Sequence, residues 1–239
     1  MKRARSLVIG LIGLVLTPAG AQAAPKAVVE IFTSQGCSSC RSADFYFAQL
    51  AEREDLLALS FHVDYWDYLG WRDTFALPEN TARQAEYAEA HGSRRIYTPQ
   101  MIVNGMVPLV GGDKAVAETA IAEADLPVPV EMRKGSGTVK IEVSARPLPG
   151  ARRTTIRLVL FSSEEKIGIT RGENAGSTLQ YRNVVRAMRP IGMWDGGAVR
   201  ITLPENELIG DGVDGCAVIV QEELPNGPGA ILGAAKLEW

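Results

Sequence analysis

The chain has few cysteines and no long hydrophobic run. Its 239 residues include three cysteines, Cys37, Cys40 and Cys216. Structural zinc sites use four ligands and commonly a second cysteine pair. Here the only cysteine outside the pair is the distant Cys216, which argues against structural zinc. The apolar run from Leu7 to Leu16 is shorter than the roughly 20 residues that a membrane-spanning helix needs. Lysine and arginine form no basic stripe, and we therefore expect no nucleic-acid partner.

The first residues have the pattern of a secretory leader. Lys2, Arg3 and Arg5 precede the apolar run, and an Ala-Gln-Ala triplet ends at Ala23. This pattern predicts a signal peptide over residues 1–23, cleaved after Ala23. Its removal changes the formal net charge from -3 to -6. We expect a mature protein without a stable membrane anchor, periplasmic or secreted, in a compartment where disulfides persist.

The residues from 27 to 125 alternate between strand and helix patterns. Short apolar runs predict strands, amphipathic stretches predict helices, and Asn104-Gly105 predicts a tight hairpin turn. Because a helix joins the first two strands, they are expected to be parallel. The expected elements are strands at 27–32, 56–63, 100–103 and 107–110, and helices at 38–54, 79–91 and 114–124.

The sequence changes character after Leu126-Pro127-Val128-Pro129, which reads as a linker. Short alternating segments, divided by glycine and proline, then predict a C-terminal all-β sandwich-like domain over residues 126–239. The expected strands lie at 130–133, 138–145, 154–161, 182–188, 198–203, 216–222 and 230–237.

Cys37-Ser38-Ser39-Cys40 is the motif with the clearest chemistry. It lies between the first predicted strand and the first predicted helix, where unpaired backbone N–H groups and the helix dipole stabilise a thiolate. Such a pair can close and open a disulfide reversibly. The alternatives are a fixed structural disulfide and, with further ligands, a site for Cu(I).

The order of the predicted elements, the CxxC motif and Thr98-Pro99 before the third strand together resemble the thioredoxin fold. The resemblance covers about residues 27–125 and implies an α/β, thioredoxin-like domain, followed here by the β-sandwich-like domain. It also implies that Pro99 is cis and lies against the dithiol, and that the Thr98 backbone pairs with an extended substrate.

Three stretches, at 30–40, 62–67 and 97–100, look like a narrower family of secreted bacterial thioredoxin-like proteins whose function is unassigned. Residues 171–176 extend that likeness into the C-terminal half. In this half, Arg171, Glu173 and Asn174 either meet the N-terminal half or form a solvated turn.

The expected function is thiol-disulfide exchange with a protein or small-thiol partner, which indicates an oxidoreductase that needs no cofactor. Cys37 is the expected nucleophile, and Cys40 the resolving thiol. The alternatives are a non-enzymatic binding protein, a Cu(I) carrier that uses both cysteines, and a static disulfide. The Ser38-Ser39 dipeptide indicates neither oxidation nor reduction as the preferred direction.

Four further residues are auxiliary candidates. His62 and Asp64 lie two apart on one face of a predicted strand, where they either form a proton-moving pair or end the strand as polar residues. Arg41 follows the motif and is a possible cation for the thiolate. Trp66 belongs to an aromatic loop that either recognises a partner or closes the core. Cys216 is expected to be a core residue or to form an intermolecular bond.

Overall fold

The structure is a computed structural model that describes residues 24–147 and 153–239. The predicted signal peptide, residues 1–23, lies outside the described residues. Among the helices that are described, none is long and apolar enough to cross a membrane.

The elements before residue 124 occur in the expected order. The parallel pairing of the first two strands is confirmed, and so is the hairpin of the next two. At its turn, Asn104 and Gly105 adopt positive φ angles of 47° and 71°. The elements are β1 (Ala27–Thr33), η1 (Ser38–Cys40), α1 (Arg41–Ala51), β2 (Leu56–His62), η2 (Asp67–Leu69), α2 (Pro78–Ala90), β3 (Gln100–Val103), β4 (Val107–Val110) and α3 (Lys114–Glu123).

The second half of the chain is built from strands, and two of them are at least twice as long as predicted. β7 and β8 each have 16 residues and form a long hairpin. The elements are β5 (Val130–Lys134), β6 (Thr138–Val143), β7 (Arg153–Gly168), β8 (Thr178–Met193), β9 (Val199–Pro204), η3 (Glu205–Glu207), β10 (Gly215–Leu224) and β11 (Gly227–Glu238).

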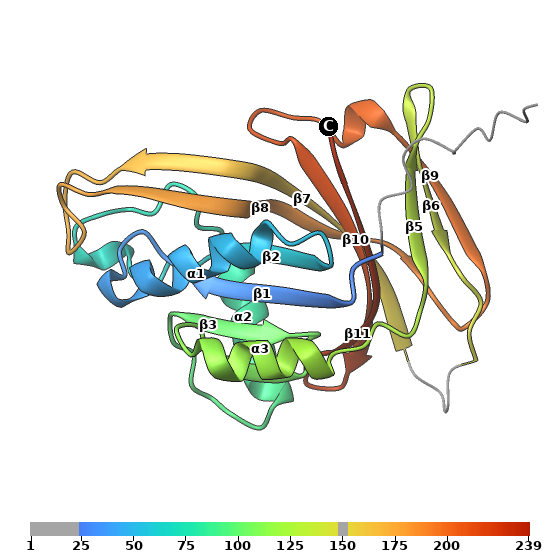
Figure 1. Ribbon diagram of the computed structural model, residues 1–239, viewed down its shortest axis with the longest axis horizontal. Helices are drawn as coiled ribbons and strands as arrows, with labels where there is room; N and C mark the ends of the chain where they lie inside the picture. The colour runs from blue at the N-terminus through green and yellow to red at the C-terminus, as the bar shows by residue number, and fades with distance from the viewer. Residues whose placement is uncertain (1–23, 148–152) are drawn as a thin grey trace, which may run out of the picture.

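The expected fold class, an α/β thioredoxin-like fold followed by a separate β sandwich, is wrong. The described chain is mostly β, and one mixed eight-stranded sheet takes strands from both halves in the order β11-β10-β7-β8-β2-β1-β3-β4 (Figure 1). The two halves meet where Ser60 of β2 pairs in parallel with Val184 of β8. Sequence periodicity identifies which residues of a strand face the core, but not which distant strand lies beside it. The segments on the two sides of the predicted boundary at residue 126 therefore both contribute strands to the main sheet.

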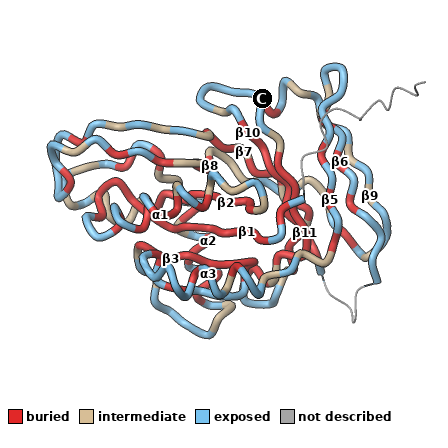
Figure 2. The backbone as a smooth tube through the Cα atoms, viewed as in Figure 1, coloured by how far each residue is buried: buried red, intermediate tan, exposed pale blue. Residues whose placement is uncertain are grey.

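The central strands of this sheet are buried (Figure 2), and three large apolar clusters pack on its faces. Helices α1 and α3 pack on one face of β1, β2 and β3. Helix α2 contributes Tyr87 to the opposite face, where β1 and β2 share one core with β7, β8, β10 and β11. The smaller sheet, in the order β5-β6-β9, packs against β7, β10 and β11 to form the third cluster.

A buried polar network ties the halves together beneath α2. Glu30 of β1 pairs with Arg83 of α2 at 2.8 Å, and Tyr87 donates to the other oxygen of the Glu30 carboxylate. From β10, Gln221 accepts a hydrogen bond from Arg83 at 3.0 Å and donates one to Tyr87 at 2.7 Å. Each charged group thus has partners from a different element, as burial of charge requires.

Candidate functional site

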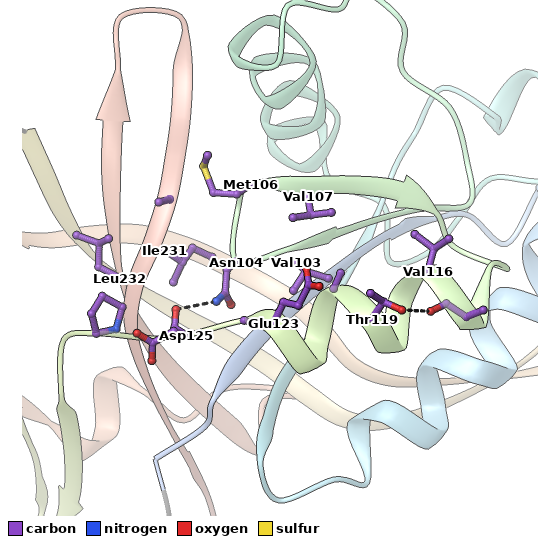
Figure 3. A pocket seen from close by; sticks show the side chains of 15 residues that line it. Val103, Asn104, Met106, Val107, Val116, Thr119, Glu123, Asp125, Ile231 and Leu232 are labelled. Carbon is purple, nitrogen blue, oxygen red and sulfur yellow. Dashed lines mark hydrogen bonds between the residues drawn. The ribbon is translucent and has the colours of Figure 1, made fainter.

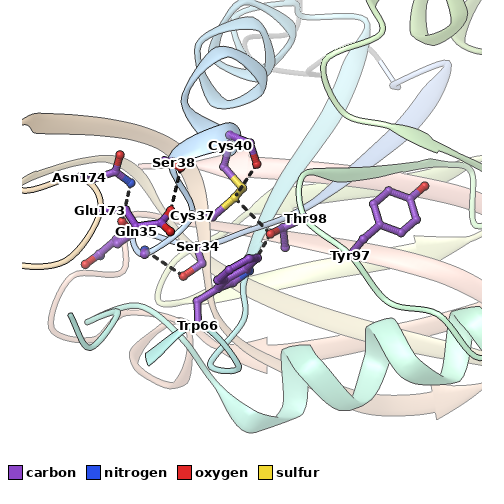
Figure 4. Close-up of a disulfide and its surroundings, with 12 residues drawn as sticks. Ser34, Gln35, Cys37, Ser38, Cys40, Trp66, Tyr97, Thr98, Glu173 and Asn174 are labelled. Atoms are coloured by element: carbon purple, nitrogen blue, oxygen red, sulfur yellow. Dashed lines mark hydrogen bonds between the residues drawn. A yellow bond between two sulfur atoms is a disulfide. The ribbon is translucent and has the colours of Figure 1, made fainter. Parts of the chain in front are cut away.

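The two cysteines of the motif form a disulfide at the junction of β1 and α1 (Figure 4). The Cys37 and Cys40 Cα atoms are 5.4 Å apart. Cys37 has extended backbone, and the short η1 turn then continues into α1, so the bridge lies at the amino end of the helix. Both residues are buried, with exposed fractions of 1% and 0%. The sulfur predicted to attack a partner is therefore covered in this structure.

Thr98 lies against the disulfide, as the resemblance implied, and Trp66 is linked to it through Thr98. The Thr98-Pro99 peptide bond is cis. The Thr98 hydroxyl donates to Cys37 Sγ at 3.2 Å and accepts a hydrogen bond from Trp66 Nε1 at 2.7 Å. The indole is half-buried and also packs against the core beneath α2. A donor chain from Trp66 through Thr98 thus ends on the Cys37 sulfur.

On the other side, the tip of the β7–β8 hairpin, residues 169–177, lies against the motif (Figure 4). The Ser38 hydroxyl donates to Glu173 Oε2 at 2.7 Å. Asn174, only 2% exposed, donates from Nδ2 to the Gln35 carbonyl at 2.9 Å. Of the two alternatives for this segment, the contact with the N-terminal half is confirmed for Glu173 and Asn174, whereas Arg171 is exposed. Sequence reasoning missed these pairs because each joins residues more than 130 positions apart.

The hypothesised pair of His62 and Asp64 does not form. His62 Nδ1 instead pairs with Asp73 Oδ2 at 2.7 Å, and both side chains are fully buried. Asp64 accepts a hydrogen bond from the Thr81 hydroxyl at 2.7 Å. Of the two alternatives for these residues, the proton-moving pair is wrong, because period-2 geometry places two residues on one face without making them neighbours. The loop after β2 instead returns Asp73 to the His62 ring, and β2 ends at His62, as the other alternative expected.

Asp73 also holds the segment that leads into the motif. Its Oδ2 accepts the Gln35 backbone N–H at 2.7 Å, and its Oδ1 accepts that of Phe75 at 2.8 Å. Burial raises the pKa of the Asp73 carboxyl, but His62 and these backbone donors outweigh it, and the pKa is lowered overall. An ionised Asp73, from the loop after β2, thus holds the turn before Cys37 through the Gln35 amide.

Asp44 is a second carboxyl that sequence reasoning missed. It lies in the first turn of α1 and is 8% exposed. It lies four residues after Cys40, a spacing that places two side chains on the same side of a helix. Burial raises the pKa of Asp44 to about 7, an effect that His62 partly opposes. The four-residue spacing from Cys40 was the sequence signal that could have placed Asp44 near the motif.

The remaining candidates are not part of this cluster. The Arg41 side chain is exposed and forms no hydrogen bond or ion pair with a described residue. Cys216 is fully buried in β10, where burial raises the pKa of its thiol to about 12, so its expected core position is confirmed. Within residues 24–147 and 153–239, no three His, Cys, Asp or Glu side chains are placed to hold a metal ion.

Fold and site together define a mostly-β protein in which a buried CxxC disulfide lies between a helix end and the tip of a long hairpin. The chain belongs to the family described as "Protein of unknown function (DUF1223)", whose model matches residues 28–221. The expected membership of a family without an assigned function is thereby confirmed. Its thioredoxin-like part has no support from these comparisons.

The chain is also similar to a solved structure. The chain is 35% identical to an Agrobacterium tumefaciens protein whose X-ray crystal structure superposes with a TM-score of 0.79. The match covers 91% of this chain and 96% of that one. No curated protein matches the chain.

Proposed function

We propose that this protein catalyses thiol-disulfide exchange through Cys37 and Cys40, with a protein or a small thiol as partner, in the periplasm or outside the cell. The observation that carries the proposal is the hydrogen bond from Thr98 to Cys37 Sγ, backed by the Trp66 indole. Hydrogen bonds to the charged form of a group favour that form. A hydroxyl aimed at one of the two sulfurs therefore selects Cys37 as the thiolate.

The helix gives the same sulfur a second source of stabilisation. Cys37 is the N-cap of the turn that leads into α1, and its side chain makes no capping hydrogen bond. The amino end of a helix favours negative charge nearby. Glu173, which accepts from Ser38, acts in the opposite sense because a carboxylate beside a thiolate raises the pKa of the thiol.

The reaction is an exchange of sulfur–sulfur bonds. The Cys37 thiolate attacks one sulfur of a partner disulfide, a mixed disulfide forms, and the other partner sulfur leaves as a thiolate. Cys40 then loses its proton and attacks Cys37 Sγ, which closes the Cys37–Cys40 bond and releases the second partner thiolate. The partner is reduced by two electrons and the protein is oxidised. Run backward, the same steps oxidise a partner dithiol.

Two measurements test this function. The Cys37–Cys40 bond is expected to have a reduction potential in the range of known oxidoreductases, roughly -270 to -120 mV. The reduced Cys40→Ser variant is expected to accumulate a mixed disulfide through Cys37, because no second thiol releases the partner. Cys37→Ser is the matched control, since it keeps Cys40 and removes the nucleophile. A potential below about -300 mV together with no trapped partner would identify a static bridge instead.

A further inference from the structure

An open pocket of about 770 Å³ lies far from the dithiol, between α3, the turn of the β3–β4 hairpin and the middle of β11 (Figure 3). Val103 and Asn104, which line it, lie beside the start of β1, whereas Cys37 follows the end of that strand. Six residue steps of strand separate the two ends by about 20 Å. The pocket is thus a separate site.

The lining of this pocket leaves large apolar side chains in contact with solvent. Met106, Val107 and Val116 line it, and their exposed fractions are 53%, 42% and 46%. Small residues of α3, Ala115 and Ala120, form one wall, so a ligand can approach the helix closely. Contiguous exposed apolar surface marks binding sites, and the volume falls within the range of small-molecule pockets.

The polar groups of the pocket are chiefly acceptors. Two of its side chains carry hydrogen-bond donors, and each makes a hydrogen bond within the protein: Asn104 gives one of its two N–H groups to the Asp125 carbonyl at 3.0 Å, and Thr119 donates to the Ala115 carbonyl at 3.0 Å. The carboxylates of Glu123 and Asp125 line the pocket and have no partner among the described residues. Glu123 is also the last residue of α3, where the helix dipole adds negative potential.

We propose that this pocket binds a small amphipathic cation, a molecule with an apolar chain and a positively charged end. The apolar chain covers Met106, Val107 and Val116, and the cation lies against Glu123 and Asp125. An anionic ligand would bring a further negative charge beside these two carboxylates, and among the described residues no cationic side chain lines the pocket to pair with it. The site has no role in the chemistry of Cys37 and Cys40, so it stands or falls independently of the proposed function.

Calorimetric titration of residues 24–239 with decyltrimethylammonium and with decanoate, each below its micelle-forming concentration at neutral pH, tests the proposal. The cation is expected to bind one site about fivefold more tightly than the anion, which corresponds to a total of about 1 kcal/mol from the two exposed carboxylates. The Glu123→Gln, Asp125→Asn double variant is expected to lose this preference while still binding the apolar chain.

A matched pair of tryptophan variants locates the site. Thr119→Trp places a large side chain in the pocket and is expected to weaken decyltrimethylammonium binding by about tenfold or more. Ala122→Trp is the control, because Ala122 is exposed on the same helix outside the lining. Equal binding of cation and anion, or equal loss in the two tryptophan variants, would overturn the proposal. Binding of an apolar lysine-containing peptide without binding of decyltrimethylammonium would also overturn it, in favour of a polypeptide partner.

Discussion

Thr98 donates its hydroxyl hydrogen bond to Cys37 Sγ at 3.2 Å, although 61 residues separate the two in the sequence. The contact distinguishes the two sulfurs of the disulfide, because it is made to one of them. Trp66 Nε1 fixes the direction of the bond, since its donation to Thr98 Oγ1 occupies an acceptor site of the hydroxyl and leaves the hydroxyl hydrogen for the sulfur.

Thr98→Val is therefore expected to raise the pKa of the Cys37 thiol. The substitution keeps the shape of the side chain and removes the donor, and a hydrogen bond to a charged group contributes about 1.5–3 kcal/mol, which corresponds to a shift of about one pH unit or more. The pKa is read from the pH dependence of iodoacetamide alkylation in the reduced Cys40→Ser background. Thr98→Ser retains a hydroxyl and is expected to behave like threonine. An unchanged pKa in Thr98→Val would show that the hydroxyl does not stabilise the thiolate.

Asp73→Asn is expected to destabilise the protein by about 3 kcal/mol or more. The substitution removes the carboxylate that pairs with His62 and weakens the acceptors for the Gln35 and Phe75 amides, and each hydrogen bond to a charged group contributes about 1.5–3 kcal/mol. Urea unfolding followed by circular dichroism measures the loss.

Asp64→Asn serves as the control for this comparison. Asp64 is half-buried, and its hydrogen bond to Thr81 can be kept by an amide oxygen, so a change within about 1 kcal/mol is expected. If Asp64→Asn proved as damaging as Asp73→Asn, the pairing of His62 with Asp73 would not be the interaction that stabilises this region.

Asp44→Asn is expected to stabilise the protein above pH 7. The pKa of Asp44 is raised from 3.8 to about 7 in the folded state. Between about pH 4 and pH 7 the Asp44 carboxyl therefore binds a proton in the native protein but not in the unfolded chain. The stability that depends on this proton is full below about pH 4 and is lost as the pH rises through about 7. An asparagine, which is uncharged throughout, avoids a loss of at most about 4 kcal/mol.

Free energies of unfolding measured between pH 4 and pH 9 test this linkage. The difference between Asp44→Asn and the native sequence is expected to grow with pH and level off above about pH 8. Asp211→Asn is a suitable control, because Asp211 is exposed. Parallel pH curves for Asp44→Asn and the native sequence would contradict a raised pKa.

The local parts of the structure were predictable from the sequence because they depend on residues near one another in the chain. The turn at Asn104-Gly105 and the helix after Cys40 follow from such signals. Thr98 was placed at the dithiol by a resemblance, and its role as a side-chain donor to Cys37 was not foreseen. The predicted role of Thr98 was to pair its backbone with an extended substrate, and any residue type can do this, so that role gave no reason to expect a hydroxyl contact.

The parts that failed depend on contacts between distant segments. Alternation identified β7 and β8 as strands, but their pairing with β2 depends on which sheet edge is open in three dimensions. Asp73 and Glu173 reached the site through loops whose course has no periodic signal. The burial of Asp44 was likewise hidden, because the hairpin strand β8 packs beside α1 and covers a helix face that would otherwise be solvated.

Residues 24–125 alone are expected not to fold into a stable domain. Without the second half, β2 loses its neighbour β8, and Leu57, Leu59 and Phe61 lose apolar cover from β7, β8, β10 and β11. Three such side chains contribute about 5 kcal/mol or more when fully buried, comparable to the whole stability of a small domain. Arg83 would also lose its hydrogen bond to Gln221.

Circular dichroism and urea titration of this fragment, compared with residues 24–239, measure the effect. The longer chain is expected to unfold in one cooperative transition, whereas the fragment is expected to show no cooperative transition and weak near-ultraviolet signals from its aromatic side chains. Adding residues 126–239 in trans supplies a further control, because restored signals would show that the fragment lacks the missing strands and not the capacity to fold. A cooperative transition in the fragment alone would establish an independent N-terminal domain, with the shared sheet as a later docking of two preformed halves.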